Sequence, residues 1–110
     1  MEVKSTVIEG VTVLTPTGRV NTSTAKAFET SVMDAINASK KIAIGFNEIN
    51  YISSAGLRVV LMAGKKLQAS GGVLVLINMP EKIFALFKMS GFDKILKICT
   101  SFEEAKPFFN

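Results

Sequence analysis

Short apolar stretches alternate with longer amphipathic ones along this chain. Two β-branched stretches, residues 3–8 and 11–15, flank the turn signal Glu9-Gly10 and predict a β-hairpin. Further short apolar stretches predict buried strands at residues 42–46, 73–77 and 95–99. Apolar positions at helical spacing, together with capping residues, predict four helices, which begin at Ala25, Ala55, Pro80 and just after Ser101. The second of these is expected to end at Ala69, and Glu104 is expected to complete a capping box with Ser101.

The predicted order of elements is β-β-α-β-α-β-α-β-α. Strands that alternate with helices indicate an α/β fold with a mixed, mainly parallel sheet. We therefore expect one domain, residues 1–110, with an N-terminal β-hairpin and about four helices covering the sheet.

Composition narrows the classes of function. The longest apolar runs are far shorter than a membrane span, and the first residues lack the pattern of a signal peptide, so we expect a cytoplasmic protein without membrane contact. The net charge of +4 comes from basic residues spread along the chain without interleaved aromatic residues, which argues against direct nucleic-acid binding. The single cysteine, Cys99, excludes an internal disulfide and is expected in the core.

Catalytic and metal-binding patterns are missing from the sequence. There is no histidine, which excludes Ser-His-Asp triads and histidine metal sites, and one cysteine makes no zinc site. Gly64-Lys65-Lys66 lacks the remaining residues of a phosphate-binding loop, since Val59 stands where a glycine is needed. We therefore predict no metal, no cofactor and no catalytic residue.

Ser53 and Ser54 are the candidate functional residues. They end the segment 47–54, which is predicted to be a loop between a strand and the helix 55–69, so Ser54 is expected directly before the helix. A helix start has unpaired N–H groups and partial positive charge, which suit either a capping hydroxyl or a phosphate. Capping is the commoner role of a serine at a helix start, and the spacing of the residues does not distinguish capping from phosphorylation. Arg58, Met62, Lys65 and Ala69 are expected to share an outward side of this helix, which is either an ordinary solvated face or a docking surface.

Three segments, taken together, resemble the STAS domain family, and more narrowly the stand-alone bacterial anti-sigma factor antagonists. These segments are residues 18–25, 47–61 and 89–96. The resemblance implies a binding protein rather than an enzyme. Its partner would be an anti-sigma factor with serine kinase activity, which phosphorylates a serine at this helix start and then dissociates. A metal-dependent serine phosphatase would restore the binding form.

The family loop usually reads Asp-Ser-Ser/Thr-Gly-Leu, with the middle residue phosphorylated. Aligned on Gly56-Leu57, this resemblance assigns phosphorylation to Ser54 and puts Ser53 in the place of the usual aspartate. Asn21 likewise replaces an acidic residue of the family. The resemblance thus implies a partner-binding surface around Ser54, with the further members Ser53, Asn21, Thr22, Arg58 and Met62.

Our interpretation of the sequence is a phospho-switched binding protein that regulates sigma-factor-dependent transcription. The alternative is a STAS-type subunit or regulator of a transport ATPase, which would bind constitutively through the same loop without phosphate transfer. A third class, a small nucleotide- or phosphate-binding enzyme, lacks an acid–base group in this sequence.

Overall fold

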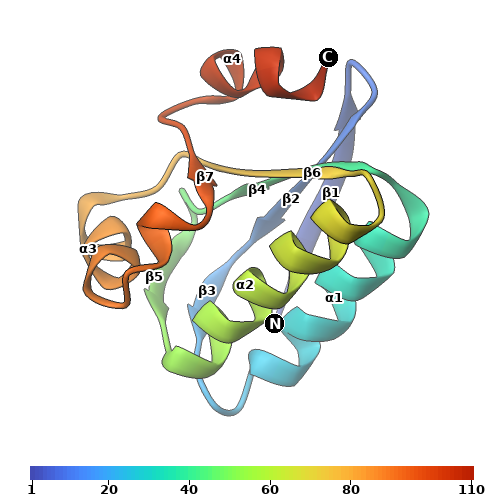
Figure 1. Ribbon diagram of the computed structural model, residues 1–110. Helices are drawn as coiled ribbons and strands as arrows, with labels where there is room; N and C mark the ends of the chain where they lie inside the picture. The colour runs from blue at the N-terminus through green and yellow to red at the C-terminus, as the bar shows by residue number, and fades with distance from the viewer.

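The computed structural model covers residues 1–110 and contains two sheets (Figure 1). The larger sheet has five strands in the order β1-β2-β4-β6-β7, and all neighbours are parallel except the β1–β2 pair. Its strands are β1 (Val3–Ile8), β2 (Val11–Pro16), β4 (Lys41–Gly45), β6 (Val73–Ile77) and β7 (Lys97–Ile98). A separate sheet pairs β3 (Gly18–Val20) with β5 (Ile49–Ile52) in parallel. The predicted mixed, mainly parallel sheet is confirmed.

The N-terminal hairpin forms as predicted. In the β1–β2 ladder, Val3 lies opposite Pro16 and Ile8 lies opposite Val11, which leaves a two-residue turn. Both turn residues, Glu9 and Gly10, have left-handed backbone with φ of 52° and 81°. This conformation matches the twist of the two strands, and glycine adopts it without a steric cost.

Four helices cover the sheet, as predicted. They are α1 (Ala25–Ala38), α2 (Ser54–Ala69), α3 (Glu81–Met89) and the short α4 (Phe102–Ala105), and α3 begins one residue later than expected. Figure 1 shows α1 and α2 side by side across one face, with α4 at the other end of the molecule from the start of α2. None of these helices is both long and apolar enough to cross a bilayer.

Both faces of the large sheet are buried at its central strands β4 and β6, which explains the apolar run of β6. Leu74 and Leu76 belong to the main core under the helices α1 and α2. Val75 and Ile77 point to the opposite face and pack in a second core that contains Cys99 and residues of the C-terminal segment. Cys99 is buried as predicted, and burial raises the pKa of its thiol.

The prediction that residues 47–54 form only a loop is wrong. The segment contains β5, whose partner β3 was also not predicted. β3 has three residues and β5 has four, so neither is long enough to show a strand-like alternation. Their pairing joins two segments about thirty residues apart, and this is a contact that local sequence patterns do not report.

The C-terminal predictions need two corrections. The strand expected at 95–99 is reduced to Lys97–Ile98, and Ile95, at 61% exposure, follows a 3-10 turn at Phe92–Lys94. Ser101 does cap α4, because its Oγ accepts a hydrogen bond from the Glu104 backbone N–H at 3.2 Å. The capping box is not formed, since the Glu104 carboxylate instead accepts from Thr100 N at 3.1 Å and Thr100 Oγ1 at 2.9 Å.

Candidate functional site

The pairing of β3 with β5 brings two distant loops to the same edge. Val20 lies opposite Ile52 in this parallel ladder, so the residues that follow each strand emerge side by side. The Ser53 backbone N–H donates to the Val20 carbonyl at 2.7 Å and ties the start of α2 to the end of β3. Asn21, which begins the loop to α1, and Ser53, which directly precedes α2, therefore lie next to each other.

Ser53, and not Ser54, caps α2. The Ser53 Oγ accepts a hydrogen bond from the Gly56 backbone N–H at 3.3 Å, while its backbone is extended. Ser54 is the first residue of the helix rather than the residue before it, which corrects the predicted helix start by one position. The Ser54 side chain is exposed and makes no hydrogen bond. The two serines thus have different roles.

Gly56 allows α2 to approach the small sheet closely. A Cβ atom added at Gly56 would lie 2.6 Å from Val20 Cγ1 and 2.7 Å from Ile52 Cγ1. Valine and isoleucine have few rotamers with which to move away from such a contact. The first turn of α2 is therefore held against both strands of the small sheet, and this packing fixes the position of the Ser54 backbone.

The loop after β3 is held by its own hydrogen bonds. The Asn21 Oδ1 accepts from Ser23 N at 2.9 Å and from Thr24 N at 3.1 Å, so this amide oxygen is committed to the backbone. The Thr24 Oγ1 donates to the Arg19 carbonyl at 2.7 Å and accepts from Asn21 N at 2.9 Å. Asn21 shapes the loop, and the exposed Thr22 lies at its outer side.

Three of the predicted site residues line one hollow beside Ser54. This α1–α2 hollow has a volume of about 340 Å³ and lies between the first turns of α1 and α2. Thr22, Arg58 and Met62 line it, together with Ala25, Lys26, Glu29, Ala55 and Val59. The structure thus places Thr22, Arg58 and Met62 at the hollow, while Asn21, Ser53 and Ser54 lie beside it where β3 and β5 end.

Arg19 and Tyr51 also lie at this end of the small sheet, although no sequence pattern indicated them. The Arg19 guanidinium carbon lies 4.7 Å from the centre of the Tyr51 ring, a cation–π contact between neighbouring positions of β3 and β5. Both residues are exposed. The only signal for the pair is the β3–β5 register, which could not be read from the sequence.

The first turn of α2 presents the Ser54 hydroxyl to solvent. The Ser54 hydroxyl forms no hydrogen bond with a basic side chain that would activate it as a nucleophile. The first turn of α2 has no acidic residue, and Arg58 lies one helical turn beyond Ser54. No three cysteine, aspartate or glutamate side chains come together as a metal site. A phosphate on Ser54 would meet free N–H groups and a cation.

Comparison with known proteins defines the class. The family model of the STAS domain matches residues 2–105, so the chain belongs to the STAS domain family, as its sequence predicted. It is 32% identical over 103 residues to the "Putative anti-sigma factor antagonist BtrV" of Bordetella bronchiseptica, which covers 93% of this chain and 89% of that protein. It is 27% identical to a protein of the same description from Thermotoga maritima, over 90% of this chain and 89% of the relative.

Solved structures share the fold. The crystal structure of a "putative anti-sigma factor antagonist" from Thermotoga maritima matches with a TM-score of 0.88 and 26% identity, over 96% of this chain and 92% of the other. The anti-sigma factor antagonist SpoIIAA in its unphosphorylated form matches with a TM-score of 0.72 and 19% identity, over 96% and 94% of the two chains. The likeness to SpoIIAA concerns the fold alone.

Proposed function

We propose that this protein is an anti-sigma factor antagonist whose partner binding is switched by phosphorylation of Ser54. With Ser54 unmodified, the surface around the start of α2 binds an anti-sigma factor that has serine kinase activity, and a sigma factor is thereby freed. With Ser54 phosphorylated, the complex dissociates, and a serine phosphatase returns the protein to its binding form. The names of the BtrV and Thermotoga maritima relatives support this proposal.

The observation that carries the proposal is the difference between the two serines. Ser53 uses its Oγ to cap α2, while Ser54 is exposed, free of hydrogen bonds and beside the α1–α2 hollow. A kinase needs such an accessible hydroxyl. In the transfer, the Ser54 Oγ attacks the γ-phosphorus of ATP, ADP leaves, and a base of the kinase takes the hydroxyl proton. The antagonist contributes the acceptor and no catalytic group.

Release follows from charge at the interface rather than from unfolding. Phosphate adds nearly two negative charges, which a helix N-terminus tolerates well. Where a partner covers Ser54, however, that charge must be desolvated or must face like charge, at a cost of several kcal/mol. Since each 1.4 kcal/mol changes affinity about tenfold, one such site is enough to separate the proteins.

Titration calorimetry with the anti-sigma factor kinase tests the proposal. We expect Ser54→Ala to bind like wild type, and Ser54→Asp to bind at least about tenfold more weakly with its fold retained. Thr6→Asp, on the exposed strand β1, is the matched control for added charge and should bind like wild type. Equal binding of Ser54→Asp and wild type to the anti-sigma factor would contradict the switch, and no binding of either would favour the constitutive regulator of a transport ATPase.

The modified residue is tested separately with kinase and ATP. Ser54→Ala should block phosphate incorporation, and Ser53→Ala should retain it. Phosphate found on Ser54→Ala would refute the assignment to Ser54 while leaving the binding experiment unaffected.

A further inference from the structure

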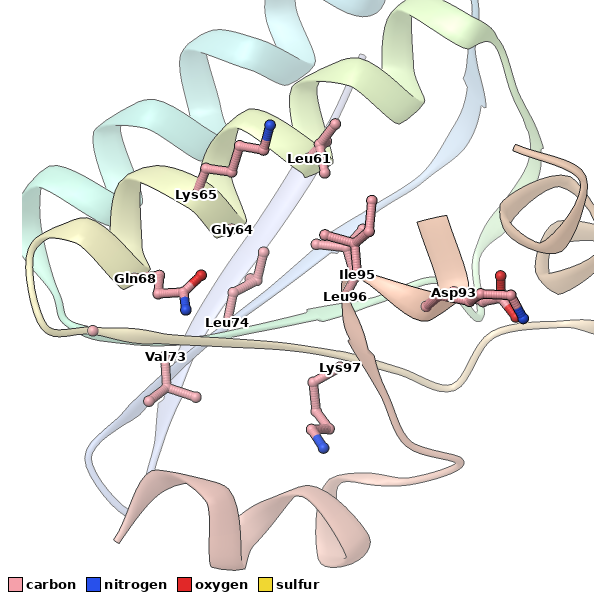
Figure 2. A pocket seen from close by; sticks show the side chains of 12 residues that line it. Leu61, Gly64, Lys65, Gln68, Val73, Leu74, Asp93, Ile95, Leu96 and Lys97 are labelled. Carbon is pink, nitrogen blue, oxygen red and sulfur yellow. The ribbon is translucent and has the colours of Figure 1, made fainter. Parts of the chain in front are cut away.

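A second concave surface lies on the other side of α2, away from the α1–α2 hollow. This α2–β7 groove, of about 400 Å³, runs between the second half of α2 and the segment that leads into β7 (Figure 2). Its lining is apolar at Leu61, Ile95 and Leu96 and basic at Lys65, Lys94 and Lys97. Neither Ser54 nor another proposed switch residue lines it.

The floor of the groove is fixed by a close contact with a glycine. A Cβ atom at Gly64 would lie 2.9 Å from Leu96 Cδ2, so Leu96 packs against the bare helix backbone. Figure 2 shows Leu61 and Lys65 on the α2 side, facing Ile95 and Leu96. Ile95 is 61% exposed, which is a large apolar exposure at the edge of a concavity.

The charges around this floor are mostly unneutralised cations. Lys65, Lys94 and Lys97 are exposed and form no ion pair, because the salt bridges of the molecule involve only Lys4 and Lys106 as cations. Lys97 turns toward the C-terminal segment, where its ammonium lies 4.4 Å from the Phe108 ring centre. Asp93 is the one carboxylate in the lining. An occupant that matches this surface must carry negative charge around an apolar group.

We propose that the α2–β7 groove docks an acidic segment of a partner protein, with one apolar side chain of that segment seated between Lys65 and Ile95. A second copy of this chain fits poorly, because the protein has a net charge of +4. Its acidic residues near the C-terminus are also engaged, Glu103 with Lys106 at 3.2 Å and Glu104 with Thr100. We therefore assign the complementary charge to another protein, and self-association is an outcome of the test.

This docking is independent of the charge on Ser54. Gly64, at the centre of the groove, lies ten residues beyond Ser54 on α2, which is about 15 Å along the helix axis. At physiological salt, charges this far apart on an exposed surface are largely screened. The groove therefore offers a partner a contact that remains available in both states of the proposed switch.

Peptide selection tests the proposal with the whole protein. A phage library of random peptides is selected on wild type, and enriched peptides are synthesised and titrated by fluorescence anisotropy. We expect acidic peptides with a central leucine, isoleucine or phenylalanine. Their affinity should fall about fivefold or more in Lys65→Glu and in Ile95→Asp, and should weaken as salt is raised. It should be unchanged in Lys82→Glu, a matched exposed lysine on α3, and in Ser54→Asp.

Three results would overturn the proposal. The first is enrichment of peptides without acidic residues, and the second is binding that neither Lys65→Glu nor Ile95→Asp weakens. The third is self-association in sedimentation experiments that Ile95→Asp abolishes, which would make the occupant a second copy. Ile95 is mostly exposed, so circular dichroism of Ile95→Asp should match wild type and show that lost binding does not reflect unfolding.

Discussion

The Ser53 Oγ accepts a hydrogen bond from the Gly56 N–H at 3.3 Å and caps α2, whereas the neighbouring Ser54 hydroxyl makes no hydrogen bond. In the family pattern that the sequence resembles, an aspartate usually stands at the position of Ser53. A serine there still supplies an oxygen to cap the helix, and it does so without placing a carboxylate beside Ser54. Replacing Ser53 and replacing Ser54 should therefore have different effects on the stability of the protein.

We expect Ser53→Ala to lower the free energy of unfolding by about 1 kcal/mol, because the first turn of α2 loses its cap. Ser54→Ala should change this free energy by less than about 0.5 kcal/mol, since an exposed side chain without a hydrogen bond is removed. Urea denaturation of the two variants measures the difference. Equal losses in both would show that Ser54 also supports the fold.

Negative charge at Ser54 should stabilise the isolated protein. We expect Ser54→Asp to raise the free energy of unfolding by about 0.3–1 kcal/mol, because it places an anion in the first turn of α2. Arg58 lies one turn further along and should supply about 0.3–0.5 kcal/mol of that gain. A double-mutant cycle with Arg58→Ala, measured by urea denaturation, isolates this share. Lower stability of Ser54→Asp would contradict the view that the switch acts only at the interface.

The same substitution should have different effects at two glycines of α2. Gly56→Ala should destabilise the protein by about 1–3 kcal/mol, because its new Cβ meets the stiff side chains of Val20 and Ile52. The new Cβ of Gly64→Ala meets the Cδ2 tip of Leu96 at 2.9 Å and that of Leu74 at 3.6 Å, and a gain in helix propensity of up to about 1 kcal/mol offsets the closer contact. Thermal melts of both variants test this, and equal destabilisation would be inconsistent with the packing described.

Stability should depend on Glu104 in acid. Hydrogen bonds from Thr100 N and Oγ1 lower the pKa of the Glu104 carboxyl in the folded protein. Between the lowered pKa and the ordinary glutamate value of about 4.3, the unfolded chain binds more protons, so stability rises with pH in this window. As pH falls through it, wild type should lose more stability than Glu104→Gln. Urea midpoints across this range, with Thr100→Val as an intermediate case, provide the measurement.

The hydrophobic pattern was sufficient to predict the layers of the fold but not the details of the site. The apolar run of β6 correctly indicated a strand buried on both faces, because Leu74 and Val75 each meet a separate core. The proximity of Asn21 to Ser53 depends on the ladder between β3 and β5, two strands too short to show a periodic pattern. Family resemblance predicted that these residues belong together, and the structure gives the physical reason.

Arg19 and Tyr51 have a practical consequence for following this protein in solution. Tyr51 is the single tyrosine of the chain, and the chain has no tryptophan. The intrinsic ultraviolet emission of the protein therefore comes mainly from one ring, three residues before Ser54 and 4.7 Å from the Arg19 guanidinium carbon. Any ligand that covers the small sheet or displaces Arg19 changes the surroundings of that ring. The molecule thus contains its own optical reporter at the site where the proposed partner binds, and no label needs to be attached.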